Sequence, residues 1–472
     1  MKRNILITLY LAGSMIIAGC NKYLDVTPKS QLSESQMFES EVGFQQALMG
    51  IYSQMASRSL YGDNQSMGFV SALAQNYSVS GAGAPLAEAR ALNYTSQQVI
   101  NYTTAIWSAS YTAIAGVNNI ISNADENRTM FTGNNYGMIK GEALALRAFL
   151  HFELLRLFGP EYTLGKDQKA IPYRMTVDQY SQIPATTAEV VKLALDDLAA
   201  AANLLVKVDP IVSGSPNRRI KMNYYAVKAL EARVRLYIGD NAGAAAAAHD
   251  VVDAGKFPFV TASAASQTMG SRDRLYITEQ VFCLRVPNIK DWAEVSYFRF
   301  NGSTSVKLTQ SDANFKSLYE AGTGGTGATD LRYRFLIEQD GGAPFPSKFW
   351  QTYQFSTMDS NRLDQLVPVI RLSEMYYILA EVAATPQEGV GYLNKVRVAR
   401  ALAELPASIT ATTLQNEITK EYQKEFYAEG QWFYYYKRKK MVRMRFMTKD
   451  IPLSKYVLPI PPSELEFNPN YN

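Results

Sequence analysis

The segment 222–255 constrains the fold most, because its sequence fits two packed helices that leave apolar side chains on two sides. In its first half, apolar residues recur every three or four positions in two neighbouring rows, and charged residues occupy the remaining face. A Gly-Asp-Asn turn at 239–241 ends the first helix, and the alanine-rich run 242–248 allows a second helix to approach closely. One hairpin cannot bury both faces. We therefore expect further hairpins stacked against it in a tetratricopeptide-like solenoid.

The same helical period recurs on both sides of this hairpin. It predicts helices over 41–57, 107–123, 141–158, 188–206, 371–384, 386–402 and 414–436. Two segments lack it: 60–104, which is rich in glycine and reads mostly as loop, and 257–368, which contains short strand-like pieces such as 280–286. Loops on a rigid scaffold often carry binding residues. We therefore predict a mainly α protein with an irregular, loop-rich binding subdomain.

The amino terminus predicts export and anchoring. Two basic residues precede an apolar run at 5–18 that is too short to span a membrane and fits a signal peptide. The run ends Ile-Ala-Gly-Cys, which resembles a bacterial lipobox with Cys20 as the lipidated residue, and several acyl chains would anchor the protein firmly. Ordinary cleavage of a signal peptide is the alternative.

These patterns divide the chain into five parts. We expect a signal peptide at 1–19, a lipidated tether at 20–40, an N-terminal helical scaffold at 41–256 with a loop insertion at about 60–104, an irregular ligand-binding region at 257–368, and a C-terminal helical scaffold with an extended, proline-rich tail at 369–472.

Composition argues against several classes of protein. Once Cys20 is acylated only Cys283 remains, so no intramolecular disulfide can form. The two histidines, His151 and His249, both lie in helical patterns, which argues against a His/Cys zinc site and favours core or helix-surface positions. The net charge of +4 is too small for a dedicated nucleic-acid binder. We expect no metal and no cofactor.

Two motifs suggest phosphate binding but lack the required context. The run 322–327 matches G-x-G-x-x-G, yet no strand precedes it and a charged stretch follows, so a flexible loop is the better interpretation. The basic run 437–445 follows a helix, which favours a solvated helix end with lysines near the C-terminal dipole. Paired carboxylates for glycoside hydrolysis meet in space and not in sequence, so spacing does not exclude them.

Aromatic residues make up 12% of the chain, and several gather with polar neighbours in the two irregular segments. Flat rings beside hydrogen-bonding groups suit sugar rings or peptide side chains. The alternative is that these rings are core residues that attach long loops to the scaffold. The predicted ligand-binding residues are Tyr61, Asp63, Asn64 and Tyr77 in the early segment and Trp292, Tyr297, Trp350 and Tyr353 in the late one.

Eight stretches, in order along most of the chain, together resemble the SusD/RagB-like nutrient-binding outer-membrane lipoproteins. They are the lipobox with NKYLDVTP, the helix around Trp107 with Asn118-Asn119-Ile120, GEALALRAFLHFELLRLFG, RIKMNYYAVKALEARVRLYIGD, RLSEMYYILAEVAA, YLNKVRVARAL, ITKEYQKEFYAEGQWF and YVLPIPPSELEFNPNYN. One departure is the Gln431-Trp432 pair after Glu429-Gly430, where many members have an arginine and an aspartate.

The resemblance implies a scaffold of four tetratricopeptide-like units that carries a binding subdomain. It implies a lipid-anchored outer-membrane protein that faces the cell exterior, captures an oligosaccharide or a peptide, and passes it to a SusC-like TonB-dependent transporter without any bond chemistry. It also implies that the late helices are structural, so that Arg371, Glu374, Glu381 and Arg397 form scaffold ion pairs.

Two other functions stay open at this point. A surface glycosidase would need a carboxylate pair in the loop regions, with Asp63, Asp291, Asp312 and Asp330 as the candidates. A tetratricopeptide-type scaffold that binds only a protein partner would use the loops as its docking surface.

Overall fold

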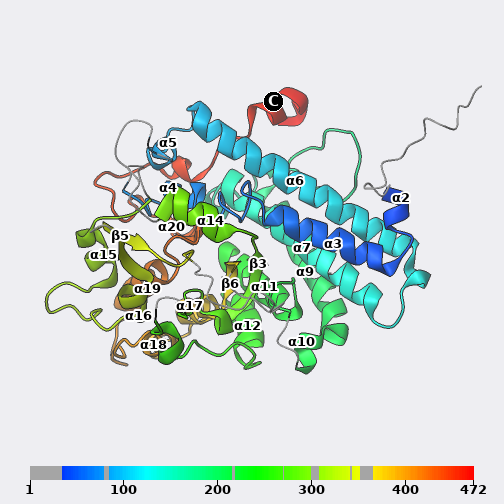
Figure 1. The fold of residues 1–472 in the computed structure, drawn as a ribbon. Helices are drawn as coiled ribbons and strands as arrows, with labels where there is room; N and C mark the ends of the chain where they lie inside the picture. Colours follow the sequence, from blue (N-terminus) through cyan, green and yellow to red (C-terminus); the bar gives the residue numbers. More distant parts are fainter. Residues whose placement is uncertain are drawn as a thin grey trace, which may run out of the picture.

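Packed helices make up most of the molecule in the computed structural model (Figure 1). The structure describes residues 34–78, 84, 86–214, 218–268, 271–298, 308–340, 343–350 and 365–471. Its longer helices are α3 (Glu41–Met55), α6 (Gln97–Glu126), α7 (Asn135–Phe158), α9 (Thr187–Val208), α11 (Tyr224–Ile238), α12 (Asn241–Val252), α17 (Leu372–Val382), α18 (Pro386–Ala399), α19 (Ala411–Glu425) and α20 (Gln431–Arg438). Neighbours in sequence pack as hairpins: α6 with α7, α7 with α9, α11 with α12, and α17 with α18. The predicted mainly α fold is confirmed.

The α11–α12 hairpin lies at the centre of this stack, as its sequence predicts. Gly239 ends α11 in the left-handed conformation, with φ of +80°, and the Asp240 side chain accepts a hydrogen bond from Gly243 at the start of α12. Helix α11 packs on α9, and α12 packs on α17. The hairpin therefore joins the N-terminal and C-terminal parts of the scaffold, which explains its two apolar faces.

Helix α6 begins ten residues before the predicted start at Trp107. Val99, Thr103 and Ile106 are buried and continue the row of core residues toward the N-terminus. Two short helices, α4 (Phe69–Leu73) and α5 (Ala87–Arg90), lie within the segment predicted mostly as loop, and the tail predicted to be extended contains α21 (Pro462–Phe467). Helices this short have no sustained period, so the sequence pattern does not detect them.

The single helix predicted over 414–436 is wrong, because the chain breaks between α19 and α20. Gly430 adopts a φ of +75°, and a Cβ there would lie 2.4 Å from the carbonyl oxygen of Gln65. The N–H of Gly430 donates to Ser71 Oγ at 3.0 Å, and the N–H of Ala428 donates to Asn76 Oδ1 at 2.9 Å. The early irregular segment is thus bound to the C-terminal helices at this break.

Three two-stranded antiparallel sheets accompany the helices in the described residues. The pairs are β1 (Lys169–Ile171) with β2 (Ala185–Thr186), β3 (Gln280–Arg285) with β6 (Leu366–Arg371), and β4 (Ile337–Asp340) with β5 (Ala343–Pro346). Strand β3 confirms the strand-like piece predicted at 280–286. Strand β6 runs directly into α17, so the β3–β6 pair ties the late irregular region to the scaffold.

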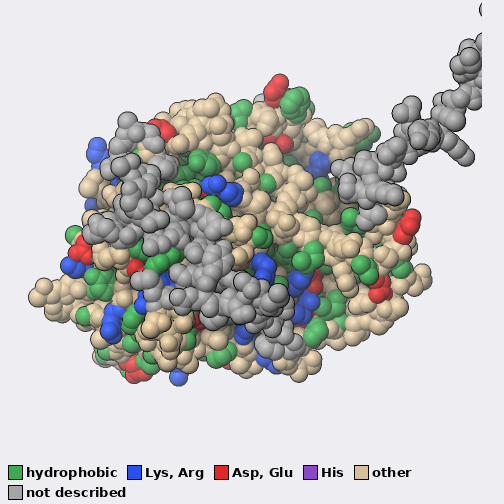
Figure 2. Space-filling model, viewed as in Figure 1, with side chains coloured by type: hydrophobic (Ala, Val, Ile, Leu, Met, Phe, Trp, Pro, Cys, Tyr) green, Lys and Arg blue, Asp and Glu red, His purple; other side chains and the backbone are tan. Residues whose placement is uncertain are grey.

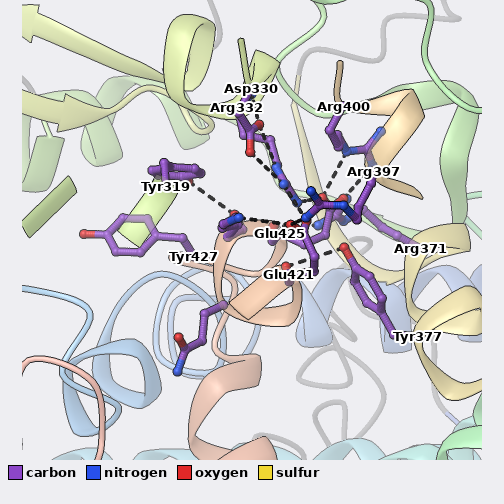
Figure 3. A network of polar contacts seen from close by, with 12 residues as sticks. Tyr319, Asp330, Arg332, Arg371, Tyr377, Arg397, Arg400, Glu421, Glu425 and Tyr427 are labelled. Atoms are coloured by element: carbon purple, nitrogen blue, oxygen red, sulfur yellow. Dashed lines mark hydrogen bonds and ion pairs between the residues drawn. The ribbon is translucent and has the colours of Figure 1, made fainter. Parts of the chain in front are cut away.

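A buried network of charges fastens this late region to α18 and α19 (Figure 3). Glu425 accepts hydrogen bonds from Arg332 at 2.9 Å, from Arg400 at 2.6 and 3.0 Å, and from Arg371. Arg332 also binds Asp330 and Glu421. Every one of these side chains is at least 97% buried. Because each of these charges except Asp330 has several charged partners, the network offsets part of the cost of removing ions from water.

The ion pairs predicted for the late helices are confirmed. They join Arg371 to Glu425 and Glu429, Arg397 to Glu421, Glu374 to Arg233, and Glu381 to Arg438. The Arg438 guanidinium, followed by Lys439, lowers the pKa of Glu381 to about 2 against the effect of burial.

The basic run 437–445 is the predicted solvated helix end only in part, because Lys440 and Arg443 are exposed but Lys437 is not. The Lys437 side chain is buried, and its ammonium donates to the carbonyl oxygens of Arg156 at 2.8 Å and Gly159 at 2.5 Å. Lys439 pairs with Glu381 at 3.1 Å. Lys437 therefore caps the C-terminus of α7 and not that of its own helix, a long-range contact that local sequence does not reveal.

Candidate functional site

One of the places where the early and late irregular segments meet is a group of four residues, which we call the Asp63 cluster: Arg58, Asp63, Trp292 and Tyr297. Trp292 lies on α14 (Ile289–Ala293), and Tyr297 lies on the following π-helical turn η3 (Glu294–Phe298). Asp63 Oδ2 accepts hydrogen bonds from Arg58 Nε at 3.1 Å, Arg58 Nη2 at 2.8 Å and the Tyr297 hydroxyl at 3.0 Å. The Arg58 guanidinium lies over the Trp292 ring, 4.7 Å from its centroid.

Exposure separates the cluster into an outer and an inner layer. The Arg58 side chain is 58% exposed and the Asp63 side chain 4%. Trp292 is half-buried and Tyr297 is buried. Within the described residues Arg58 Nη1 makes no hydrogen bond. The outer layer therefore offers a ring and a cation with spare donors, and the inner layer orients them.

Burial sets the electrostatics of this cluster. Removal from water raises the pKa of Asp63 to about 6, although the hydrogen bonds from Arg58 and Tyr297 act in the opposite direction. Burial also raises the pKa of Tyr297, with the Asp63 charge as the next cause. Asp63 is therefore a carboxyl group that changes charge near pH 6 inside the candidate site.

The other predicted site residues lie outside the outer layer. Tyr61 donates to Glu153 at 2.7 Å, Tyr77 to the carbonyl of Met67 at 2.5 Å, and Asn64 to the carbonyl of Ser59 at 3.3 Å; all three are buried. Trp350 is buried against Phe345 and the guanidinium of Arg274. Tyr353 lies outside the described residues.

Sequence reasoning missed Arg58. The available signal was its position just after the first helix, five residues before Asp63 and next to an aromatic-rich loop. Its role depends on Trp292, more than 200 residues away, so its sequence neighbourhood alone does not identify it.

A hollow in the surface, which we call the α6 groove, lies between the middle of α6, the segment 172–182 and α21. Its volume is about 610 Å³. Three apolar side chains on its walls are strongly exposed: Val177 at 53%, Tyr180 at 73% and Phe467 at 76%. Arg174 donates to the carbonyl of Tyr180 at 2.8 Å and to Asp178 at 3.0 Å, which fixes the conformation of the loop. None of the predicted site residues that the structure describes lines this groove.

Other motifs form no site in the described residues. The run 322–327 lies in a loop of bends and turns, in agreement with the predicted loop, and only the short helix α16 (Leu331–Leu336) follows it. His151 is buried between the carbonyl of Arg147 and the N–H of Arg174, and His249 lies at the surface of α12, in agreement with the two predicted kinds of position. No group of three metal-ligating side chains is found among the described residues.

The carboxylates considered for glycoside hydrolysis have other partners. Asp330 is completely buried and binds Arg332 through both oxygens. Asp312 pairs with Lys316 at 2.7 Å on α15 (Asp312–Tyr319). The side chain of Asp291 lies outside what the structure describes. Asp63 binds the Arg58 guanidinium and the Tyr297 hydroxyl, so it too has partners.

On the described part of the face shown in Figure 2, neither positive nor negative side chains dominate. Lys and Arg side chains are spread singly or in small groups, with acidic side chains between them. This distribution fits the small net charge of +4. Among the described helices, none combines the length and the apolar character needed to cross a bilayer.

Comparison with known families identifies the chain. Residues 22–236 match the SusD-like family described as starch-binding and associating with the outer membrane, and residues 296–443 match the SusD family. The chain belongs to the SusD/RagB-like family. The predicted resemblance is thereby confirmed. No curated protein matches the sequence.

Solved SusD structures share the fold at low sequence identity. A SusD superfamily protein from Bacteroides thetaiotaomicron is 21% identical, with 91% of this chain and 98% of that one covered and a TM-score of 0.66. A SusD-like carbohydrate binding protein from Bacteroides vulgatus is 18% identical, with 91% and 97% covered and a TM-score of 0.70. A second SusD superfamily protein from Bacteroides thetaiotaomicron reaches 0.71 at 17% identity, with 92% and 98% covered. At these identities the likeness concerns the fold.

Proposed function

We propose that this SusD-family protein captures an oligosaccharide at the Asp63 cluster and delivers it to a SusC-like TonB-dependent transporter. The observation that carries the proposal is the partly exposed Arg58–Trp292 stack, in which guanidinium donors lie over an aromatic ring. Sugars have an apolar face and a rim of hydroxyl groups, so a ring next to fixed donors suits them. The family description, starch-binding and outer-membrane association, supports the same ligand class.

In this proposal each residue of the cluster has a distinct part. Trp292 packs against a sugar ring, and Arg58 donates to its hydroxyl groups. Asp63 and Tyr297 lie beneath and fix the orientation of Arg58. Tyr61, Asn64 and Tyr77 are buried, and their hydrogen bonds hold the early loop in place. Preformed geometry reduces the entropy lost on binding.

The cluster favours binding over hydrolysis. Glycosidases of the usual kind use two carboxyl groups on either side of the scissile bond. Among the described residues, Asp63 is the one carboxylate in the cluster, and it is occupied by Arg58 and Tyr297. We therefore propose that the protein is not an enzyme and releases its ligand unchanged.

We also propose that Cys20 carries the lipid anchor and that the protein faces the cell exterior in the outer membrane. The lipobox sequence supports the first part, and the family description supports association with the outer membrane. Fourteen residues, 20–33, separate the anchor from the first described helix, α2 (Glu34–Met37). Fully extended, they span about 45–50 Å, enough to place the folded part above the bilayer.

A calorimetric titration of the chain from Asn21 onward against a panel of oligosaccharides and peptides tests the ligand class. We expect saturable heat with at least one oligosaccharide and none with the peptides. Heat from peptides alone would contradict the oligosaccharide assignment. If no member of the panel gave binding heat while the protein still bound the transporter, the result would favour the scaffold that binds only a protein partner.

Oligosaccharide affinity should fall about tenfold between pH 8 and pH 5, because Asp63 titrates near pH 6 and its protonation removes the acceptor that orients Arg58. Since the pKa in the folded state lies above the ordinary value, the proton is taken up as the pH falls from 7 to 5. The same shift means that the stability contributed by Asp63 is largest below pH 4 and is lost as the pH rises through 6.

The matched control for this pH dependence is Asp63→Asn. It should bind weakly at every pH and show a flat profile between pH 5 and pH 8. A wild-type profile that is equally flat, measured by calorimetry at constant ionic strength, would show that Asp63 does not control the site.

The transporter should contact the α6 groove, because this part of the surface exposes Val177, Tyr180 and Phe467 on a hydrogen-bonded loop and helix. We expect Tyr180→Ser with Phe467→Ser to weaken binding to the co-purified transporter about 10- to 30-fold and to leave oligosaccharide affinity unchanged. Val42→Ser is the matched control, since Val42 is 60% exposed on α3, on another part of the surface. An undiminished complex would place the transporter contact elsewhere.

A further inference from the structure

A small internal cavity lies where α7, α11, α17 and α20 meet. Its volume is about 40 Å³, which is enough for one small ion or for very few water molecules. Its lining includes Arg156 of α7, Arg233 of α11, Glu374 of α17 and Tyr434 of α20. Its other walls include apolar side chains such as Phe152, Leu236 and Ile378, so the charged and polar groups lie on part of the surface of the cavity. The cavity lies between the N-terminal and C-terminal halves of the scaffold.

Three buried polar atoms around this cavity have no hydrogen-bond partner in the described part of the chain. They are Arg156 Nε, Arg233 Nη1 and the Tyr434 hydroxyl. Their residues are only 5%, 6% and 5% exposed. A guanidinium N–H can only donate, and the Tyr434 hydroxyl can donate as well. An unsatisfied buried donor is costly, so the missing partner in the cavity should be an acceptor.

The carboxylates nearby are already used. Glu374 accepts from Arg233 Nε and Nη2, both at 2.7 Å, and Glu381 accepts from Arg438 at 2.6 and 2.8 Å. Glu153 accepts from Tyr61 at 2.7 Å and from Arg156. Arg233 Nη1 lies 3.8 Å from Glu153, which is too far for a hydrogen bond. Each of these carboxylate oxygens already accepts at least one hydrogen bond, and none of them accepts one from the three free donors.

The charged side chains around the cavity together carry one net positive charge. The charged residues that line the cavity are Arg156, Arg233 and Arg438 with Glu374 and Glu381. Their further ion-pair partners are Glu153, which pairs with Arg156, and Lys439, which pairs with Glu381 and is 27% exposed. We propose that the cavity binds a single monovalent halide, chloride in the cell's surroundings, which accepts from Arg156, Arg233 and Tyr434. A water molecule would satisfy part of the donors but would leave the excess charge in place.

A halide at this position would connect helices that are distant in sequence. It joins α7 and α11 of the N-terminal scaffold to α20 of the C-terminal scaffold. Arg438 and Glu381 line the cavity and have side chains that are 16% and 12% exposed, so we place the entrance for the ion on their side. This inference is independent of the proposed oligosaccharide site, because no residue of the Asp63 cluster lines the cavity.

Thermal unfolding in sodium chloride and in sodium gluconate at equal ionic strength tests the proposal. A ligand that binds only the folded state raises the melting temperature, and we expect an increase of about 2–5 °C in saturating chloride. Tyr434→Phe should lose most of this increase. Tyr435→Phe is the matched control, because Tyr435 also lines the cavity but its hydroxyl is already hydrogen-bonded to Thr419 at 2.7 Å.

Crystals of the wild-type protein grown in sodium bromide give an independent readout that does not depend on either variant folding. We expect an anomalous peak within hydrogen-bond distance of Arg156, Arg233 and Tyr434. Equal melting temperatures in the two salts, together with a cavity that holds water and no bromide, would overturn the proposal.

Discussion

Glu425→Gln should lower the free energy of unfolding by about 3–5 kcal/mol, because it removes the acceptor charge that three buried arginines share. Arg400 donates to Glu425 through Nη2 at 2.6 Å and Nε at 3.0 Å, and Arg332 donates at 2.9 Å. Arg371 is the third donor. The arginines hold the pKa of Glu425 well below its usual range, so the carboxylate is ionised throughout the neutral range.

Glutamine keeps the size of the side chain and one acceptor oxygen. The loss in the free energy of unfolding therefore measures mainly the effect of removing the charge. Arg332, Arg371 and Arg400 remain buried and lose one counter-charge. Because the network joins α19 to the late irregular region, we expect this region to open together with the scaffold. Urea denaturation followed by circular dichroism measures the change in the free energy of unfolding.

Glu417→Gln is the control for this measurement. Glu417 lies on the same helix and pairs with Lys420 at 2.7 Å, but the Lys420 side chain is 39% exposed. Such pairs contribute about 0–1 kcal/mol. If Glu425→Gln cost no more than Glu417→Gln, the buried network would not be what attaches the late region to α19.

Trp292→Ala should weaken oligosaccharide binding about 10- to 100-fold, which corresponds to the loss of one aromatic stacking surface and of the support under Arg58. The guanidinium lies 4.7 Å from the ring centroid, so removal of the ring leaves Arg58 with Asp63 as its remaining contact in the cluster. Titration calorimetry with the best saccharide of the panel gives the change in affinity.

Tyr180→Ala serves as the control, because its ring is 73% exposed in the α6 groove and belongs to no part of the Asp63 cluster. Its affinity for the saccharide should equal that of the wild type. An equal loss in both variants would show that the effect of Trp292→Ala is not specific to the proposed site. Circular dichroism confirms that each variant is folded.

The helices could be predicted because their signal is local. Apolar periodicity identifies α7, α9, α11, α12, α17 and α18 within a few residues, and turn residues such as Gly239 fix where the α11–α12 hairpin bends. The break at Gly430 could not be predicted in this way. It depends on the carbonyl of Gln65, more than 360 residues earlier in the chain.

The candidate site was predictable only in part. Aromatic and polar residues in the two irregular segments indicated Asp63, Trp292 and Tyr297, which the structure brings together. The same criterion also selected Tyr61, Tyr77 and Trp350, which are buried. Composition does not distinguish an exposed ring from a buried one, because that difference is decided by packing between distant segments.

A crystal structure with the tightest-binding oligosaccharide of the panel tests the proposed site most directly. We expect a sugar ring packed on Trp292 and a hydroxyl group within hydrogen-bond distance of Arg58, with Asp63 and Tyr297 unchanged beneath them. An oligosaccharide bound in the α6 groove or beside Trp350, with the Asp63 cluster free of ligand, would contradict the assignment.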